Sequence, residues 1–271
     1  MTDRCFSPFS LDEDIDRREV PALKFPPMVL GQDGRDLFAA GVADMDFKAP
    51  PVVLDALGMR LGHGVLGYEA VPAELLPALT GWLQDRHGWQ VNQEHILRAQ
   101  NVLNALAMAA SIFTEVGDGV IVQPPVFFDF FDILRENGRT LITNPLVLND
   151  GRYTMDFADL ERKAAAPQTK MIYLCNPHNP VARVWTADEL RTLGDICIEN
   201  GVIVVADEMH GDLAFPDHPY TPFSSLSARH AGNCITCLYQ RRRLTSPRVA
   251  LHLRLSKTKK CAPLFRPRVV D

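Results

Sequence analysis

The sequence predicts an α/β fold built on a mostly parallel sheet. Short continuous apolar runs recur along the chain, segments with helical periodicity lie between them, and turn-forming residues separate the two kinds of segment. This alternation is typical of buried parallel strands covered by helices. The 271 residues are 46% hydrophobic, which is enough for one domain, or for one domain and part of a second.

The elements follow one another in a regular order after a proline-rich, irregular start at residues 1–40. Pro72, Ala73 and Glu74 open one helix, which Gly88 closes. Helices are expected at 50–62, 72–87, 102–114, 126–137, 156–165 and 186–200. Strands are expected at 119–123, 140–146, 170–175, 202–206 and 233–238.

The most clearly defined unit covers residues 170–207. Thr186 and Glu189 form a capping-box pattern at the start of its helix, and Gly201 stands where a left-handed residue ends it. The helix therefore joins two apolar strands in a βαβ unit, for which a right-handed crossover is expected.

This unit also locates a candidate site. Its first strand leads into Asn-Pro-His-Asn-Pro at 176–180, and its second leads into Asp-Glu-Met-His at 207–210. Ligands bind outside the carboxyl ends of parallel strands, so both polar segments should meet at one edge. Asn-Pro pairs also favour turns, and Asn176 is expected to hold the turn.

Charge divides the chain unevenly. Residues 239–271 hold ten Lys or Arg and one acidic residue, so this segment carries a formal +9 and residues 1–238 carry −14. Such a step marks a basic tail or a segment foreign to the fold. We expect an N-terminal arm at 1–45, an incomplete large domain at 46–238 and a basic tail at 239–271.

Composition excludes several classes of protein. No run of about 18 apolar residues exists, so no membrane partner is expected, and no secretory signal is visible at the start. Six dispersed cysteines fit reduced thiols and a cytoplasmic location. The net charge of −5 gives no indication of nucleic-acid binding.

The motifs resemble a known family. The pair of segments at 176–180 and 207–210 is similar to that of fold-type I pyridoxal-phosphate (PLP) enzymes of aminotransferase class I/II. The branch of cystathionine β-lyase-like C–S lyases resembles this chain more closely. Five stretches support that branch: VADMDFKAPP (42–51), HGVLGYEAVPAEL (63–75), WLQDRHGW (82–89), GDGVIVQPPVFFDF (117–130) and HPYTPFSSLS (218–227).

The resemblance implies the PLP-transferase fold of the large domain and a set of PLP-binding residues. Asp207 would hold the pyridine nitrogen protonated, so that the ring withdraws electrons. Asn179 would donate to the ring oxygen, and His210 would lie near that oxygen. Phe127 takes the place of the family's usual stacking aromatic residue.

Further positions follow from the same resemblance. Val102 and Leu103 match the helix start that binds the phosphate, where Asn101 replaces a glycine and is expected to keep a left-handed turn. Tyr68 matches a residue that reaches the partner subunit's cofactor, which implies a homodimer. Val42 and Ala43 match a loop near the amino-acid substrate, and no metal is implied.

The family's Schiff-base lysine is missing. It should lie about 35 residues after Asp207, where Arg242 stands, and arginine cannot form a Schiff base under these conditions. The C-terminal small domain, roughly 120 residues, is also largely missing. A frameshift near codon 239 is one hypothesis, because a shift by one nucleotide can turn Arg-Arg-Arg-Leu into Ala-Ala-Lys-Thr. Lys257 is an improbable substitute.

The resemblance implies a C–S β-lyase that converts cystathionine or cysteine-type substrates to a thiol, pyruvate and ammonia, with activity impaired in this chain. An aminotransferase and a non-catalytic truncated protein are the alternatives. A helicase reading of Asp-Glu-Met-His fails because the chain contains no Gly-Lys phosphate loop. Cys234 and Cys237 are expected as buried strand residues, and His210, Asp212 and His218 are too loosely spaced for a metal site.

Overall fold

The computed structural model describes residues 10–17, 23–24, 44–67, 70–239 and 249–253. Contacts divide the chain into two compact units: residues 1–69 with 241–246, and residues 70–240 with 247–271. The described part of the first unit contains helix α2 (Pro51–Gly62). All other helices and strands discussed below belong to the second unit.

A seven-stranded sheet forms the centre of the second unit within the described residues, in the order β1-β9-β8-β7-β6-β2-β3. Strands β8, β7, β6, β2 and β3 run parallel, whereas β9 is antiparallel to both β8 and β1. The predicted mostly parallel sheet is therefore confirmed. The strands are β1 (Ile96–Ala99), β2 (Gly119–Val122), β3 (Thr140–Thr143), β6 (Thr169–Cys175), β7 (Ile203–Asp207), β8 (Cys234–Tyr239) and β9 (Val249–Leu253).

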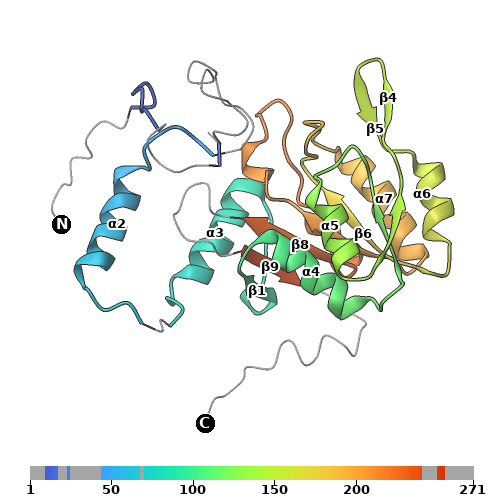
Figure 1. The fold of residues 1–271 in the computed structure, drawn as a ribbon, viewed down its shortest axis with the longest axis horizontal. Helices are drawn as coiled ribbons and strands as arrows, with labels where there is room; N and C mark the ends of the chain where they lie inside the picture. The colour runs from blue at the N-terminus through green and yellow to red at the C-terminus, as the bar shows by residue number, and fades with distance from the viewer. Residues whose placement is uncertain (1–9, 18–22, 25–43, 68–69, 240–248, 254–271) are drawn as a thin grey trace, which may run out of the picture. The chain divides into compact units, whose positions relative to one another are not determined.

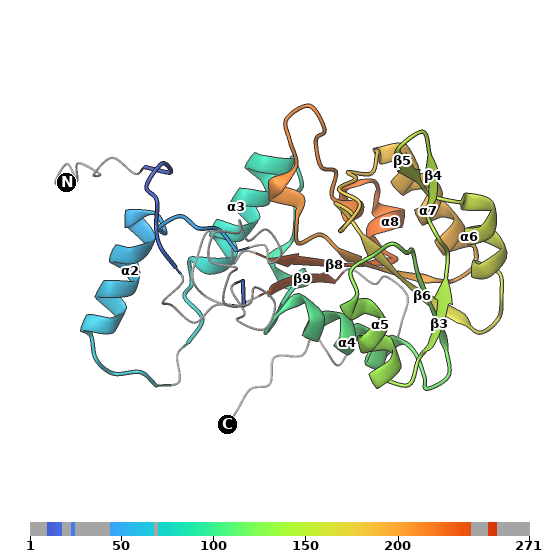
Figure 2. The same cartoon turned by 45° about the horizontal axis from the view of Figure 1, so that its top comes forward.

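Helices cover both faces of this sheet (Figure 1). Figure 2 shows α4 and α5 on one side of the sheet and α7 and α8 on the other. We call these the α4 face and the α7 face. The helices of this unit are α3 (Leu75–His87), α4 (Val102–Phe113), α5 (Asp129–Glu136), α6 (Phe157–Ala164), α7 (Ala187–Glu199) and α8 (Ala228–Ala231).

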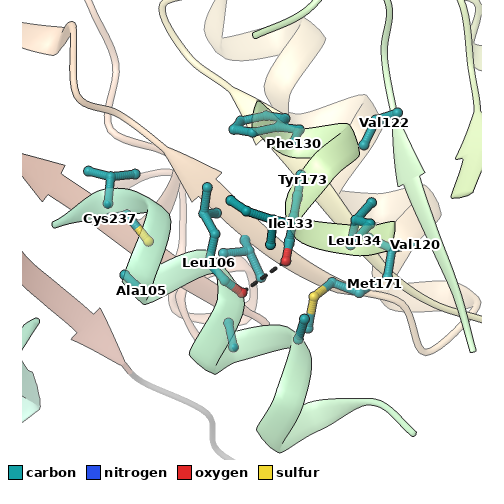
Figure 3. Close-up of a cluster of buried hydrophobic side chains, with 14 of the residues drawn as sticks. Ala105, Leu106, Val120, Val122, Phe130, Ile133, Leu134, Met171, Tyr173 and Cys237 are labelled. Carbon is teal, nitrogen blue, oxygen red and sulfur yellow. Dashed lines mark hydrogen bonds between the residues drawn. The ribbon is translucent and has the colours of Figure 1, made fainter. Parts of the chain in front are cut away.

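The α4 face is packed around aromatic and aliphatic side chains from β2, β6, α4 and α5 (Figure 3). Phe130 is fully buried and meets Tyr173 edge-on, with ring centroids 5.4 Å apart. The Tyr173 hydroxyl donates a hydrogen bond of 2.9 Å to the carbonyl of Leu106 in α4. The core of this face thus ties α4 to the middle of the sheet.

The α7 face has a separate core, because successive residues of a strand point to opposite sides. Ile172 and Leu174 of β6 pack here, whereas Met171, Tyr173 and Cys175 pack on the α4 face. The predicted capping box at Thr186 and Glu189 is present, and Gly201 has the left-handed φ of 68° expected of it.

Three strand features were not predicted. The short strand β1 has little periodicity, and the hairpin of β4 (Val147–Asn149) and β5 (Arg152–Thr154) turns at Asp150-Gly151. Both turn residues have positive φ, which such tight hairpins favour. Strand β9 falls within the segment expected to be a tail. Its sequence, VALHL, has a larger apolar residue at every second position, a strand pattern that the charge step hides.

The described residues include no helix that is both long and apolar enough to cross a membrane.

Candidate functional site

The carboxyl ends of β6 and β7 bring the two predicted polar segments together. Cys175 and Asp207 are partners in the parallel register, and the amide of Asn176 donates to the carbonyl of Asp207 over 2.9 Å. The hydrogen-bonded pairing of the two strands therefore continues one residue past β6. It fixes the register of the two polar segments along the strand direction. The two polar segments that the sequence predicts at one edge of the sheet therefore do meet there.

Asp207 is a buried carboxylate that lies on the α4 face. Its side chain is 6% exposed, and one oxygen, Oδ1, accepts the amide of Met209 over 3.1 Å. No donor reaches the other oxygen, Oδ2, and no basic side chain pairs with it, within the described part of the chain. Burial therefore raises the pKa of Asp207 to about 6, against which the Met209 hydrogen bond acts only in part.

Glu208, the next residue, is buried on the α7 face. Its carboxylate accepts from the hydroxyl of Tyr220, from the amide of Phe223 over 2.8 Å and from the side-chain amide of Asn176 over 3.2 Å. Burial raises the pKa of Glu208 to about 7, although these hydrogen bonds lower it. Sequence reasoning missed Glu208, and the signal available was its place beside Asp207 at the end of an apolar strand.

The side chain of Asn176 is held by hydrogen bonds within the protein and is not available to a ligand. This agrees with the expectation that Asn176 holds the turn. Its side-chain amide donates to Glu208 and, over 3.1 Å, to the carbonyl of Thr221. The Asn176–Pro177 and Asn179–Pro180 peptide bonds are cis. The side chain of Asn176 therefore points into the α7-face network and away from Asp207.

Asn179 lies close to Asp207 through Cys175. The amide of Asn179 donates to the Cys175 sulfur over 3.3 Å, and Cys175 is the register partner of Asp207. The side-chain amide of Asn179 has no hydrogen-bond partner among the described residues and lines a pocket of about 830 Å³. It is thus available to a ligand.

His178 connects the Asn179 segment to the loop that carries Phe127. Its Nε2 lies 2.9 Å from the Pro125 carbonyl, and its amide donates to the Arg183 carbonyl over 2.7 Å. Burial lowers the pKa of His178 to about 4, so the ring is neutral and donates from Nε2 at physiological pH. This buried link is a second feature that the sequence reasoning missed.

Phe127, Val102 and Leu103 gather in one cluster on the α4 face. Val102 is 2% exposed, and the half-buried Phe127 and Leu103 pack against the cluster that holds Cys175, the register partner of Asp207. The three predicted residues are thus on the same face as Asp207.

The start of α4 differs from expectation at Asn101. This residue has an extended backbone (φ −156°), not the predicted left-handed one, and its side chain accepts the Asn104 amide over 2.7 Å. The prediction was wrong because Asn101 serves as the N-cap, a role that asparagine fills without positive φ. The amides of Val102 and Leu103 keep no acceptor among the described residues.

His210 follows β7 and begins the short helix η3 (Gly211–Leu213). It lines the 830 Å³ pocket together with Asn179, but Asp207 and Phe127 do not line it. Arg183 and Trp185 also line this pocket, and Trp185 belongs to the α7-face core. The structure thus brings His210 and Asn179 together in one pocket whose lining does not include Asp207.

Several predicted residues lie outside the described part of the chain: Val42, Ala43, Tyr68, Arg242 and Lys257. Cys234 and Cys237 are buried free thiols in β8, as predicted for strand residues. No group of three or more potential metal ligands comes together in residues that the structure describes.

Comparison with known families identifies a matching model. The model of aminotransferase class I and II matches residues 37–238. Cystathionine beta-lyase PatB of Bacillus subtilis (strain 168) is 47% identical over 202 residues, which cover 74% of this chain and 52% of PatB. Protein MalY of Escherichia coli (strain K12) is 32% identical over 193 residues, which cover 71% of this chain and 50% of MalY. The chain spans about half the length of these curated relatives.

Solved structures show the same relationship. Cystalysin from Treponema denticola, which contains a pyridoxal 5′-phosphate cofactor, matches with a TM-score of 0.86 and 31% identity over 92% of this chain and 65% of that one. The PLP-bound C–S lyase from Staphylococcus hominis matches with a TM-score of 0.82 and 30% identity over 92% of this chain and 64% of that one.

Proposed function

Because the chain belongs to the family of class I and II aminotransferases, we propose that it binds PLP at the carboxyl ends of β6 and β7. We further propose that it carries the binding framework of a C–S β-lyase. The similarity to cystathionine beta-lyase PatB and to the C–S lyase from Staphylococcus hominis supports this choice.

The single observation that carries the proposal is the state of Asp207. A buried carboxylate with one oxygen lacking a donor and no basic partner among the described residues is costly unless a cation binds there. A protonated pyridine nitrogen supplies a hydrogen bond and a positive charge in one group. The residues present therefore fit PLP at this position.

The other predicted residues complete the fit. The Asn179 side chain has a free amide to donate to the ring oxygen, and Phe127 presents an aromatic ring on the face that holds Asp207. The free amides of Val102 and Leu103 stand at the positive end of α4 and would hold the phosphate. His210 would lie near the ring oxygen.

PLP supplies, when bound, an electron-withdrawing ring that stabilises negative charge on the α-carbon of an amino acid. Asp207 would contribute by holding the proton on the pyridine nitrogen, because its buried negative charge favours the cationic form. We place Val42 and Ala43 near the substrate, which is cystathionine or a related cysteine derivative. The expected products are a thiol, pyruvate and ammonia.

Turnover by this chain is expected to be impaired. Arg242 occupies the position at which the family's lysine is expected, and a guanidinium stays protonated and takes up no α-proton. Lys257 would restore the function only if it reached the site. The aminotransferase reading uses the same binding residues, so reaction products must separate it from the lyase reading.

The assembly and location of the chain form part of the same proposal. Tyr68 matches a residue that reaches the partner subunit's cofactor, which supports a homodimer. The four described cysteines are all buried free thiols, which supports a reducing compartment such as the cytoplasm.

A PLP titration of the full chain tests this proposal. We expect a saturable change in PLP absorbance for the unaltered chain. Asp207→Asn should weaken the affinity about 100-fold, because the isosteric amide removes the charge that the pyridinium needs. Asp188→Asn is the matched control, since the Asp188 side chain is 91% exposed and pairs with the exposed Arg191.

Two outcomes would contradict the proposal. Equal affinity of the Asp207→Asn variant and the unaltered chain would place PLP elsewhere, and the absence of saturable binding would remove the cofactor altogether. Borohydride reduction followed by mass spectrometry then tests Lys257, for which we expect no adduct. Release of pyruvate without an amino acceptor would favour lyase over aminotransferase activity.

A further inference from the structure

Glu208 connects its own segment at the end of β7 to two other segments of the chain on the α7 face. Its two oxygens accept three donors, from Asn176 after β6 and from Tyr220 and Phe223 in the segment after η3. Glu208 is 2% exposed, and no lysine or arginine pairs with it in the part of the chain that the structure describes. Among the described residues, hydrogen bonds alone therefore offset the burial of this carboxylate, and they do so in part, because the pKa of Glu208 stays raised to about 7.

The side-chain contacts around Glu208 extend through Tyr220 to helix α3. The rings of Tyr220 and His87 meet edge-on with centroids 5.0 Å apart. His87 Nε2 and the indole of Trp82 lie 2.9 Å and 3.2 Å from the same oxygen of Asp212. One connected set of side chains thus joins the end of β7 to a helix outside the βαβ unit.

Glu208 and Asp207 are consecutive in the chain and point to opposite faces. The backbone at this point is held on both sides, since the Asn176 amide donates to the Asp207 carbonyl and the Glu208 amide donates to the Cys237 carbonyl, each over 2.9 Å. These two bonds hold the main chain, and the three hydrogen bonds of the Glu208 side chain add a further restraint directly after Asp207.

We propose that Glu208 is a positioning residue, whose contacts with Asn176, Tyr220 and Phe223 fix the end of β7 and so hold the Asp207 carboxylate in place for its cationic ligand. This proposal rests on the proposed binding of PLP at Asp207. It assigns Glu208 no contact with the cofactor. The Met209 amide, which donates to Asp207 Oδ1, reports the position of Asp207 even without ligand.

Substitutions at Glu208 separate the effect of its hydrogen-bonding contacts from the effect of its negative charge. Glu208→Gln keeps the shape, and its amide can still accept from Phe223 and Asn176 and donate to the Tyr220 oxygen. Glu208→Ala removes all three contacts. Glu208→Asp keeps the charge but shortens the side chain, and it replaces the alanine variant if that variant fails to fold.

Thr236→Val is the matched control for a purely structural loss. Thr236 is fully buried in β8, and its hydroxyl lies 2.7 Å from that of Ser224 in helix η4 (Phe223–Ser225). The variant removes a buried hydrogen bond to the same region, yet Thr236 has no contact with Glu208 or Asp207 among its hydrogen bonds.

The experiment measures hydrogen exchange of the Met209 amide and PLP affinity in the full chain. Glu208→Ala, or Glu208→Asp in its place, should speed the exchange and weaken PLP binding, each about 10-fold. Glu208→Gln should stay within about twofold of the unaltered chain in both measurements. Thr236→Val should lower the melting temperature without changing either.

Three results would overturn the proposal, and the first two are unchanged Met209 exchange in Glu208→Ala and equal losses in Thr236→Val. If the unaltered chain binds no PLP, the proposed function fails, but the exchange measurement still decides whether Glu208 positions Asp207. A Glu208→Gln variant that behaves like Glu208→Ala would show that charge, not position, matters, and would also overturn it.

Discussion

The two adjacent carboxylates Asp207 and Glu208 lie on opposite faces of the sheet, and they differ in how many hydrogen bonds they accept. On the α7 face, Glu208 has three donors and belongs to a closed network. On the α4 face, Asp207 has one donor and an oxygen that no described residue satisfies. Both groups are buried, and burial raises the pKa of both. The difference lies in the number of hydrogen-bond donors that each carboxylate has among the described residues.

This contrast separates a structural carboxylate from a binding one. A saturated buried carboxylate stabilises the arrangement of the segments that donate to it. An unsaturated one costs stability in the free protein and recovers that cost when a cation binds.

Asp207→Asn should stabilise the ligand-free chain. The pKa of Asp207 lies near 6 in the folded state and near 3.9 in the unfolded state, so the folded chain loses stability as pH rises from about 4 to 6. The asparagine variant should be more stable by about 3 kcal/mol above pH 6 and equal below pH 4. Urea unfolding at pH 4 and pH 7.5 measures this difference. A loss of stability at pH 7.5 would show that Asp207 is already compensated.

Tyr220→Phe should destabilise the closed network. The variant leaves one Glu208 oxygen without its hydroxyl donor, which costs about 2 kcal/mol when Glu208 is ionised. The Tyr220 hydrogen bond also lowers the pKa of Glu208, so this pKa should rise in the variant. The loss should therefore be larger at pH 8 than at pH 5, as measured by urea unfolding. A loss that does not depend on pH would mean that Glu208 does not ionise in this range.

Gly194→Ala should show how tightly the α7 face is packed. A methyl group at this position would lie 2.4 Å from His230 Cδ2 and 2.9 Å from the Phe223 ring. Overpacking should outweigh the gain in helix propensity and cost about 1 to 2 kcal/mol. Thermal unfolding measures the effect, and Gly81→Ala in α3 is the control because nothing lies within 4 Å of its added methyl. Equal effects at the two sites would contradict tight packing.

Tyr173→Phe should have the smallest effect. The variant removes one hydroxyl that donates to the Leu106 carbonyl in the core of the α4 face (Figure 3), which costs about 1 kcal/mol. PLP affinity should not change, because this hydroxyl lies in the interior of the face. Denaturant unfolding and PLP titration test both statements. A large loss of PLP affinity would contradict the second, because it would show that this core hydroxyl contributes to the binding site.

The sequence predicts the parallel sheet and the position of the site because both depend on local patterns. The apolar runs around 170–175 and 202–206 become β6 and β7, and the motifs that follow them meet at one edge. The Glu208 network depends on donors 32 residues upstream and 12 to 15 residues downstream, which no local pattern shows. Strand β9 was missed because the charge of its neighbours hides a short apolar alternation.

The protonation state of bound PLP tests the central claim most directly. We would record the nitrogen NMR signal of ¹⁵N-labelled PLP bound to the full chain, at a pH where free PLP has lost its pyridine proton. We predict the chemical shift of a protonated nitrogen in the unaltered chain. In Asp207→Asn we predict the chemical shift of an unprotonated nitrogen. An unprotonated nitrogen in the unaltered chain would contradict the assignment of Asp207 as the partner of the cofactor.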